Sequence, residues 1–306
     1  MMDSMIPVLA GTLAAATPLI FAGLGELVAE RSGVINLGVE GMILIGAIAG
    51  FAAAAETGLG PAAGLPAGAL AGMGAALVFA VFALSLAANQ AACGLALTIF
   101  GIGLSAFIGQ HYVSYSLPGL KPLSIPLLSD IPVIGPVLFH QDAVVYLSLA
   151  AFALVAWVLA KTRLGLLLKA VGESPEAAHA IGYPVLAIRY GAVLFGGAMA
   201  GLGGAYLSTV YTPLWVQNMS AGRGWIAVAL VVFAAWKPGR LLLGAYLFGA
   251  VTILQFHAQG LGIALPVQLL AALPYLATIV VLVLISRDRR LLQLNLPASL
   301  GKPYLP

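Results

Sequence analysis

The chain has 306 residues, of which 62% are hydrophobic and only 8% are charged, and its mean hydropathy is +1.08. Because a soluble domain carries roughly a quarter charged residues, this composition excludes a soluble globular protein and predicts a polytopic membrane protein in a lipid bilayer. The net charge of +3 is too small to indicate nucleic acid as a partner, and the single Cys93 excludes an internal disulfide.

The first apolar stretch is predicted to be a retained membrane span, because Asp3 stands where a cleaved signal would carry Lys or Arg. A span needs about 20 mostly apolar residues. In chain order the predicted spans are 6–28, 36–55, 62–87, 92–113, 143–161, 188–211, 215–236, 240–258 and 268–286. The sequence therefore predicts an all-α transmembrane bundle of nine spans, with eight or ten as alternatives.

One boundary between spans depends on a polar pair alone. Residues 57–120 contain no Asp, Glu, Lys or Arg, which is too long an interval for one helix. Asn89-Gln90 is the strongly polar pair within it, so the third and fourth spans are divided there.

Lysine and arginine predict the orientation, because short basic loops stay in the cytoplasm. The basic residues expected there are Arg31, Lys161, Arg163, Lys169, Arg189, Lys237, Arg240, Arg287, Arg289, Arg290 and Lys302. Nine spans place all of them inside if the N-terminus is outside and the C-terminus is cytoplasmic. Lys121 and Arg223 then lie on the outer side.

This orientation predicts the organisation of the chain. Residues 1–290 form a single transmembrane domain, and residues 291–306 form a cytoplasmic tail. Within the domain, the proline-rich residues 114–142 form an extracytoplasmic loop and residues 162–188 form a cytoplasmic loop.

The stretch ERSGVINLGVEG, residues 30–41, is unusually polar for its position. The apolar residues that follow it are too few to cross a bilayer, so the second helix is expected to begin near Ile35. Asn36 and Glu40 would then lie on one helix face inside the membrane. Glu40 would either cap the inner helix end in a pair with Arg31 or line an aqueous pathway, and both remain open.

Glu26 and Glu30 precede this stretch and are also four residues apart. A tight turn at Gly33 follows them. We expect both carboxylates at the solvated inner end of the first helix.

A second informative stretch, LGLLLKAVGESPEAAHAIGYPVLAIR, covers residues 164–189. Ser174 can cap a helix, Pro175 suits its first position, Glu176 complements its dipole, and Gly182 can end it. A two-turn helix is therefore expected in the cytoplasmic loop. It would be either a simple connector or a docking surface for a cytoplasmic partner.

No catalytic or metal-binding motif stands out in the sequence. The chain lacks the G-x-x-x-x-G-K-[ST] motif that binds ATP, the H-E-x-x-H motif, and any cluster of Cys and His residues. We therefore expect no catalytic residues, no enzyme activity and no metal or cofactor held by this chain. The scarcity of charge within the spans disfavours a stand-alone secondary transporter but leaves it as an alternative.

Four stretches together resemble a known family. They are GELVAERSGVINLGVEGMILIGA, NQAACGLALTIFGIGLSAFIG, KTRLGLLLKAVGESPEAAHAIGYPV and GRGWIAVALVVFAAW. In this order they closely resemble permease subunits of bacterial ABC importers of the branched-chain amino acid, ribose and nucleoside superfamily. The resemblance covers about residues 20–260, and ERSGVINLGVEGM is most similar to the nucleoside (simple sugar) type branch. The amino acid branch tends to carry a histidine near Glu40, which this chain lacks.

The resemblance implies a permease subunit in the bacterial cytoplasmic (inner) membrane. It implies a second, identical or homologous permease subunit, two cytoplasmic ABC ATPase subunits that use ATP and Mg²⁺, and an extracytoplasmic substrate-binding protein or lipoprotein. The expected function is inward movement of a nucleoside. A simple sugar, a branched-chain amino acid or stand-alone secondary transport are the alternatives.

In such permeases a cytoplasmic helix inserts into a groove on the ATPase, and the resemblance implies that this coupling helix lies within 162–188. The matching residues are Gly172, Glu173, Ser174, Pro175, Glu176, Ala177, Ala178, Ile181 and Gly182.

Candidates for substrate contact are small polar or aromatic residues. They are Asn36, Glu40, Asn89, Gln90, Thr98, Phe100 and Ser105. Each has a structural alternative: Phe100 would face lipid or the core, and Thr98 and Ser105 would bond carbonyls one turn back. The stretch GRGWIAVALVVFAAW also predicts a short helix that begins with glycine in the second half of the chain. It corresponds to the glycine-interrupted region around Asn36 in the first half, and such paired broken segments often mark a transport pathway.

Overall fold

The computed structural model describes residues 2–260 except 125, 127, 130 and 133, together with 272, 273, 276, 277, 279, 280, 283 and 295–305. The helices are α1 (Met2–Arg31), α2 (Val39–Thr57), α3 (Pro61–Ala80), α4 (Gln90–Gly109), α5 (Ile134–Leu138), α6 (Ala143–Lys161), α7 (Arg163–Glu173), α8 (Pro175–Ala180), α9 (Val185–Tyr206), α10 (Arg223–Phe233) and α11 (Pro238–Gly260).

Shorter elements complete the fold. The π-helical turns η1 (Val81–Ser85) and η3 (Leu207–Tyr211) extend α3 and α9, and the 3₁₀ turn η2 (Gln110–Tyr112) follows α4. Strand β1 (Leu123–Ser124) pairs antiparallel with β2 (His140–Gln141). Apart from this strand pair and an isolated β-bridge between Ser116 and Leu214, all the regular elements of the described residues are helices.

Seven helices within the described residues are long and apolar enough to cross a membrane. They cover Met5–Arg31, Val39–Thr57, Pro61–Ser85, Gln90–Tyr112, Ala143–Lys161, Val185–Tyr211 and Pro238–Gln259. These correspond to seven of the nine predicted spans, and the break at Asn89-Gln90 is confirmed because Asn89 caps α4. The predicted span 268–286 lies largely outside the described residues.

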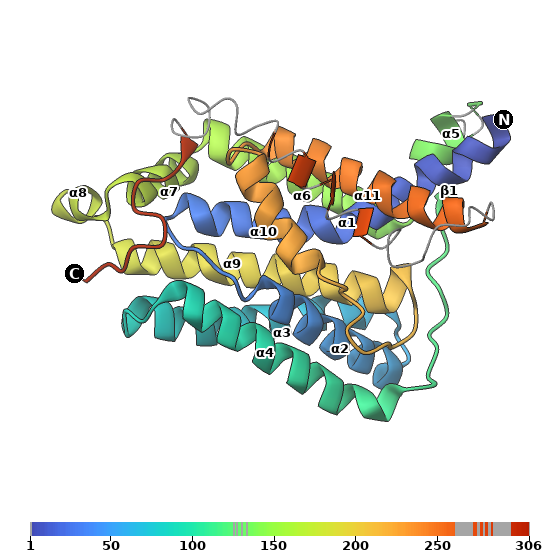
Figure 1. The fold of residues 1–306 in the computed structure, drawn as a ribbon, viewed down its shortest axis with the longest axis horizontal. Coiled ribbons are helices and arrows are strands. Elements are labelled where there is room, and N and C mark those ends of the chain that lie inside the picture. The colour runs from blue at the N-terminus through green and yellow to red at the C-terminus, as the bar shows by residue number, and fades with distance from the viewer. Residues whose placement is uncertain are drawn as a thin grey trace.

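The predicted span 215–236 is wrong. This stretch contains α10, which has only 11 residues, preceded by the irregular residues 212–222. Asn218, Ala221 and Gly222 have φ values of 58°, 47° and 79°, so no helix can run through them. The reading of this region as a short, glycine-led helix is the correct one, and Figure 1 shows α10 crossing the bundle obliquely.

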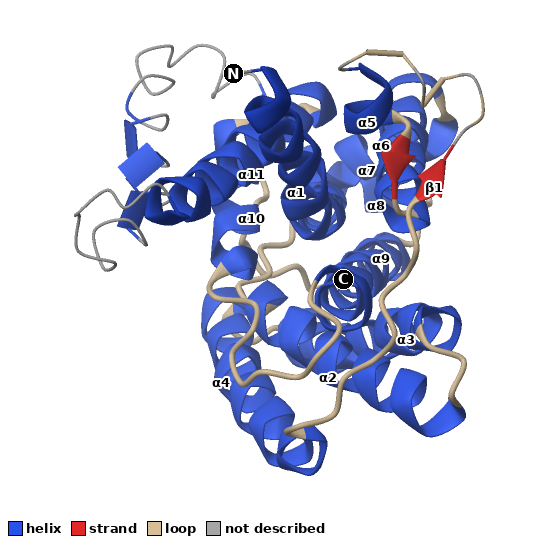
Figure 2. Ribbon diagram, turned by 90° about the vertical axis from the view of Figure 1, so that its right-hand side faces the viewer, coloured by secondary structure: helices blue, strands red, loops and turns tan. Residues whose placement is uncertain are grey.

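Helix α9 lies at the centre of the bundle. It packs against α1, α2 and α3, and α1 also packs against α11. Figure 2, which looks along the bundle, shows α9 between α1 on one side and α2 and α3 on the other. This central place explains why so much of α9 is glycine and alanine, since large side chains would hold its neighbours away.

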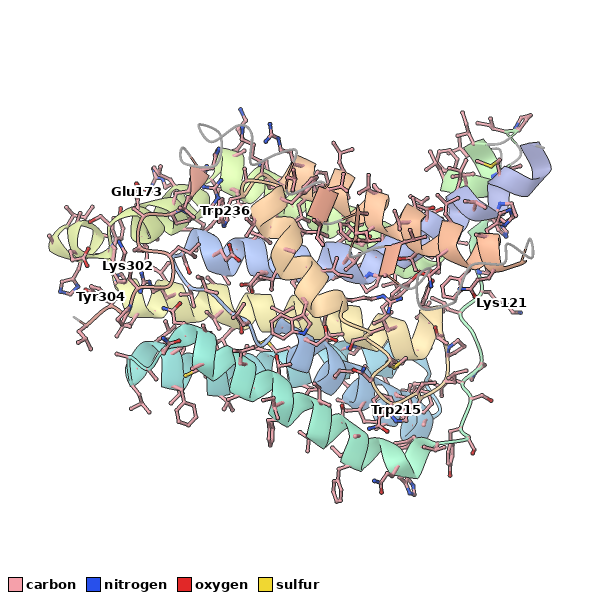
Figure 3. The ribbon with its side chains drawn as sticks, in the orientation of Figure 1. Lys121, Glu173, Trp215, Trp236, Lys302 and Tyr304 are labelled. Carbon is pink, nitrogen blue, oxygen red and sulfur yellow. The ribbon has the colours of Figure 1, made fainter. Side chains whose placement is uncertain are left out.

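The bundle has two distinct ends. One, the α8 end, carries α7, α8 and the C-terminal residues, and the other, the α5 end, carries α5, β1 and the start of α1 (Figure 1). Figure 3 places Glu173, Trp236, Lys302 and Tyr304 at the α8 end, and Lys121 toward the α5 end.

Glycines bring the main chains of α2, α3 and α9 into direct contact. A Cβ on Gly46 would collide with the main chain of Gly201, and a Cβ on Gly201 would collide with the main chain of Gly68 and Gly72. Such small residues let membrane helices approach closely and gain van der Waals contact along their length.

Substituting Gly201 with alanine is expected to destabilise the bundle, because the new methyl group meets main-chain atoms that cannot move aside. Overpacking of this kind costs about 1–3 kcal/mol. The midpoint of thermal unfolding in detergent should fall for Gly201→Ala and stay unchanged for Gly74→Ala, whose Cβ would enter open space. Equal midpoints for the two variants would contradict the close contact.

Candidate functional site

The segment between α1 and α2, residues 32–38, enters the bundle without forming a helix. Val34 and Asn36 within it are fully buried. Helix α2 begins at Val39, so the prediction that Asn36 and Glu40 share a helix face is wrong. The Asn36 side chain explains this, because its Oδ1 accepts a hydrogen bond from the Gly38 N–H at 2.9 Å, a local turn that competes with helix formation.

Helix α4 holds this segment in place from one side. The Ile35 N–H donates to Gln90 Oε1 at 2.9 Å, and Thr98 Oγ1 donates to the Leu37 carbonyl at 2.9 Å. A Cβ on Gly94 would lie 2.7 Å from the Leu37 nitrogen, so only glycine allows this approach. The polar groups of Gln90 and Thr98 thus satisfy main-chain groups that a membrane interior leaves without water.

The segment 32–38 with the start of α2 is one interrupted element of the bundle, and residues 212–222 with the start of α10 are a second. The two meet at Glu40. The Glu40 carboxylate accepts hydrogen bonds from Ser220 Oγ at 2.6 Å, from the Gly222 N–H at 2.9 Å and from the Gly224 N–H at 2.6 Å. Glu40 is only 3% exposed, and a Cβ on Gly224 would collide with it. The carboxylate therefore sits against the positive N-terminus of α10, where a negative charge is stabilised.

These bonds decide one of the two interpretations of Glu40. Pairing with Arg31 is wrong, because Arg31 instead donates to the main-chain carbonyls of Trp236 at 2.8 Å and Asn295 at 3.2 Å. A role for Glu40 in lining a pathway stays a prediction.

Two carboxylates of α1 accept hydrogen bonds from the segment 32–38 and from the turn after α10, which the sequence did not reveal. Glu26 Oε1 accepts from the Asn36 N–H at 3.0 Å, and Glu30 Oε2 accepts from Trp236 Nε1 at 2.6 Å. The expectation that they are solvated is wrong, since Glu26 is 1% exposed and Glu30 2%. Their four-residue spacing places both on one face of α1, but spacing alone does not distinguish a buried face from a solvated one.

Three predicted pathway residues lie away from Glu40. Asn89 accepts the Ala92 N–H at 3.0 Å as the cap of α4, and Ser105 donates to the Ile102 carbonyl at 3.1 Å, one turn back in its own helix. Phe100 is 58% exposed on the outer face of α4. The structure thus brings Asn36, Glu40, Gln90 and Thr98 around the interrupted segments and leaves these three outside.

The short helix expected in the 162–188 loop is confirmed as α8. Ser174 Oγ accepts the Ala177 N–H at 3.2 Å, Pro175 begins the helix, and Gly182 follows it with a φ of +92°. The residues matched to the coupling helix divide into two groups. Glu173, Glu176, Ala177, Ile181 and Gly182 are exposed, Ser174 is half-buried, and Gly172, Pro175 and Ala178 are buried.

Two cavities of about 330 and 340 Å³ open at the α8 end and share Arg31, Lys169 and Asn295 in their lining. Partial burial, and secondly the positive charge of Arg31, lower the pKa of Lys169. Two cations therefore stand close together here. In the described part of the chain, no three His, Cys, Asp or Glu side chains are grouped as a metal site requires.

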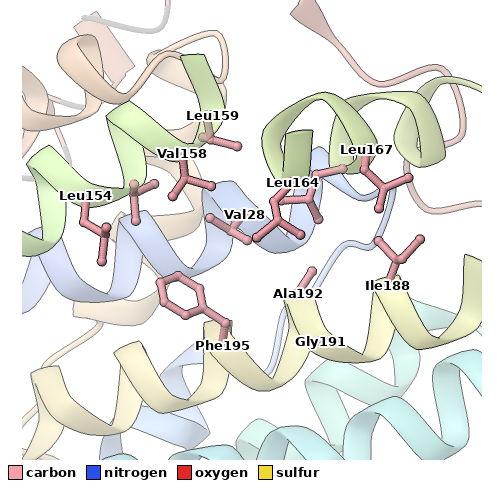
Figure 4. A pocket seen from close by; sticks show the side chains of 12 residues that line it. Val28, Leu154, Val158, Leu159, Leu164, Leu167, Ile188, Gly191, Ala192 and Phe195 are labelled. Atoms are coloured by element: carbon pink, nitrogen blue, oxygen red, sulfur yellow. The ribbon is translucent and has the colours of Figure 1, made fainter. Parts of the chain in front are cut away.

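A third cavity, of about 320 Å³, has a different character (Figure 4). It lies between α1, α6, α7 and α9. Its lining consists of Val28, Leu154, Val155, Val158, Leu159, Leu164, Leu167, Leu168, Ile188, Gly191, Ala192 and Phe195. No side chain there forms a hydrogen bond, so this groove is unsuited to a polar solute.

Three similar proteins are named as ABC transporter permeases, but their named substrates differ. A putative glucose ABC transporter permease protein of Haloferax volcanii is 43% identical, with 96% of this chain and 95% of that protein covered. A nucleoside ABC transporter permease protein of Lactococcus lactis is 34% identical (90% and 91% covered), and a guanosine ABC transporter permease protein of Bacillus subtilis is 33% identical (96% and 95%).

The family match covers most of the chain and confirms the resemblance noted in the sequence. Residues 8–285 match the family described as "Branched-chain amino acid transport system / permease component". This protein therefore belongs to that family of ABC transporter permeases and is an integral membrane protein.

Proposed function

We propose that this chain forms the transmembrane pathway of an ATP-driven importer that moves a nucleoside inward across a bacterial cytoplasmic membrane. The observation that carries the proposal is the meeting of two interrupted helices at Glu40 inside the bundle. Discontinuous helices in corresponding halves of a transporter commonly form its substrate site, because their free main-chain groups are placed where a solute passes.

The polarity of this centre suits a neutral solute. The Glu40 charge is already compensated by Ser220 and by two main-chain N–H groups of α10. Asn36 and Thr98 add uncharged polar groups to the same region. Among the predicted pathway residues, we assign Asn36, Glu40 and Thr98 to the route. An uncharged solute with many hydroxyl groups could exchange hydrogen bonds with these side chains without bringing a net charge into the membrane.

The energy source is assigned to partner subunits. The sequence has no ATP-binding P-loop, and α8 presents the exposed Ile181 beside the exposed Glu176 and Ala177. Most of the basic residues counted for the orientation belong to elements that end at the α8 end, which supports a cytoplasmic position for it. We propose that two ABC ATPase subunits dock there and use ATP and Mg²⁺, with a second permease subunit and an extracytoplasmic binding protein completing the importer.

A simple sugar is the second candidate substrate. The relative from Haloferax volcanii, named a putative glucose permease, shares 43% identity with this chain, whereas the named nucleoside and guanosine permeases share 34% and 33%. The uncharged polar groups of Asn36 and Thr98 are compatible with either class of solute.

Purification from the native host followed by reconstitution into lipid vesicles tests this function. We expect an ATPase and a second permease subunit to co-purify, and labelled guanosine or uridine to accumulate only with ATP and the binding protein. Accumulation of glucose instead would identify the sugar as the substrate. ATP-independent uptake by the lone chain would overturn the importer and establish a secondary transporter.

A further inference from the structure

The C-terminal residues 295–305, which we call the strap, contact parts of the chain that lie far apart in sequence. Figure 3 shows Lys302 and Tyr304 beside the α7–α8 region. The strap bonds to α7, to the turn after α1, and to the side chains of Gln90 and Arg189. No part of the proposed function so far uses it.

Ser299 attaches the strap to the end of α7. Both its N–H and its Oγ donate to the Gly172 carbonyl, at 3.0 and 2.7 Å. A Cβ on Gly172 would collide with the Arg31 carbonyl, so α7 and the end of α1 are in direct contact at this point. The bonds from Ser299 therefore fix the last turn before α8.

Arg189 joins the strap to the base of the interrupted segment. Its side chain is fully buried, with Nε donating to the Ser32 carbonyl at 3.1 Å and one terminal nitrogen donating to Ser299 Oγ at 3.0 Å. A buried guanidinium is costly when its donors lack acceptors, and the other terminal nitrogen of Arg189 has no hydrogen-bond partner among the described residues, so losing either of these two bonds would add to that cost.

Tyr304 packs the end of the strap against the coupling helix. It is 6% exposed and clusters with Val171, Ala178 and Val185, residues of α7, α8 and α9. The Arg189 guanidinium lies 5.8 Å from the centre of its ring, within the range of a cation–π contact. The inner face of α8 is thus covered by the strap.

The strap also reaches the polypeptide that enters the bundle. The Gly301 N–H donates to the Gly33 carbonyl at 3.1 Å, and Gln90, which holds Ile35, donates to the Lys302 carbonyl at 3.5 Å. Gly33 has a φ of +89°, and a Cβ there would collide with Ser299 Oγ. Gly33 and Gly172, which are about 140 positions apart in sequence, are thereby linked through the eleven residues of the strap.

We propose that the strap positions α8 and the interrupted segment 32–38 as one unit, so that displacement of α8 by an ATPase is transmitted to the substrate route. Ser299 and Tyr304 are the positioning residues. This inference rests on the proposed function, in which α8 docks on an ATPase and segment 32–38 borders the route.

The test compares coupling in the complete complex reconstituted into lipid vesicles. Three variants are informative: Ser299→Ala, Tyr304→Ala and the conservative Tyr304→Phe. Leu305→Ala is the matched control, since Leu305 is 75% exposed and next to Tyr304. For each variant, ATPase co-purification, the thermal midpoint, ATP hydrolysis and solute uptake are measured on the same preparation.

We expect Tyr304→Ala to keep the ATPase bound and hydrolysing while uptake per ATP falls roughly tenfold, within the range of ordinary coupling energies. Ser299→Ala should show the same pattern, and Tyr304→Phe and Leu305→Ala should retain wild-type coupling. Unchanged uptake per ATP in both Tyr304→Ala and Ser299→Ala would overturn the proposal. So would losses that merely follow the thermal midpoint or ATPase binding, because these indicate a structural role alone.

A cross-link covers the case in which Tyr304→Ala does not fold. The His179 and Tyr304 rings are 6.3 Å apart and Leu305 follows Tyr304, so His179→Cys with Leu305→Cys in a Cys93→Ser background can be joined by a flexible thiol cross-linker while Tyr304 stays in place. If strap and α8 move together, the cross-linked complex keeps its uptake per ATP, whereas blocked uptake would overturn the proposal. Failure of the proposed function is distinct, since the wild-type complex would then show no ATP-driven uptake at all.

Discussion

Replacing Glu40 with alanine is expected to abolish solute uptake. The change leaves Ser220 Oγ and the N–H groups of Gly222 and Gly224 buried without their acceptor, and each such group costs about 1–3 kcal/mol. It also removes a side chain that hydrogen-bonds the start of α2 to the start of α10. Uptake in vesicles and the thermal midpoint of the purified protein should therefore fall together.

Two further variants separate this explanation from ion coupling. Glu40→Gln keeps one acceptor oxygen but turns an N–H group toward another donor, so a partial loss of both stability and uptake is expected. Glu56→Gln, at the exposed end of the same helix, serves as the control. A Glu40→Gln protein that is fully stable but inactive would favour a coupling carboxylate, and a fully active Glu40→Ala protein would refute the role assigned here.

Replacing Ile181 with arginine is expected to prevent productive docking of the ATPase while leaving the permease folded. Ile181 is 73% exposed at the end of α8, and a positive charge there is favourable to the helix itself. Displacing a central apolar anchor from an interface costs about 2 kcal/mol or more. ATP-driven uptake should fall more than roughly tenfold, with the thermal midpoint of the permease unchanged.

The control for this experiment is Leu59→Arg. Leu59 is 67% exposed in the turn between α2 and α3, and α8 is not near it in the fold. Ala178 is a poor choice for such a test because it is buried against Val171 and Tyr304, so a large substituent would disturb the permease. Wild-type uptake in Ile181→Arg would remove α8 from the coupling mechanism.

The parts of the fold that depend on local chemistry were predictable. Seven spans follow from the length of apolar runs, because a bilayer demands about 20 such residues. Helix α8 follows from Ser174, Pro175 and Gly182, whose capping and turn preferences act within a few residues. The family was recognisable for a similar reason, since its motifs stand in order along the chain.

The polar centre was not predictable, because its bonds join residues far apart in sequence. A carboxylate before a turn is equally compatible with solvent and burial, so Glu26 and Glu30 were placed in water although they hold Asn36 and Trp236. Asn36 was assigned to a helix because hydropathy carries no information about main-chain hydrogen bonds. Nothing in the sequence around Ser299 or Tyr304 indicates that they lie against α7 and α8.

The contact of main chains among α2, α3 and α9 limits how the pathway can open. Gly46, Gly68, Gly72 and Gly201 leave no layer of side chains that could change rotamer to let these helices slide. The three helices must therefore travel as a rigid body during a transport cycle. Bending is then expected at the non-helical connections, and two of these, residues 32–38 and 212–222, adjoin the proposed substrate route.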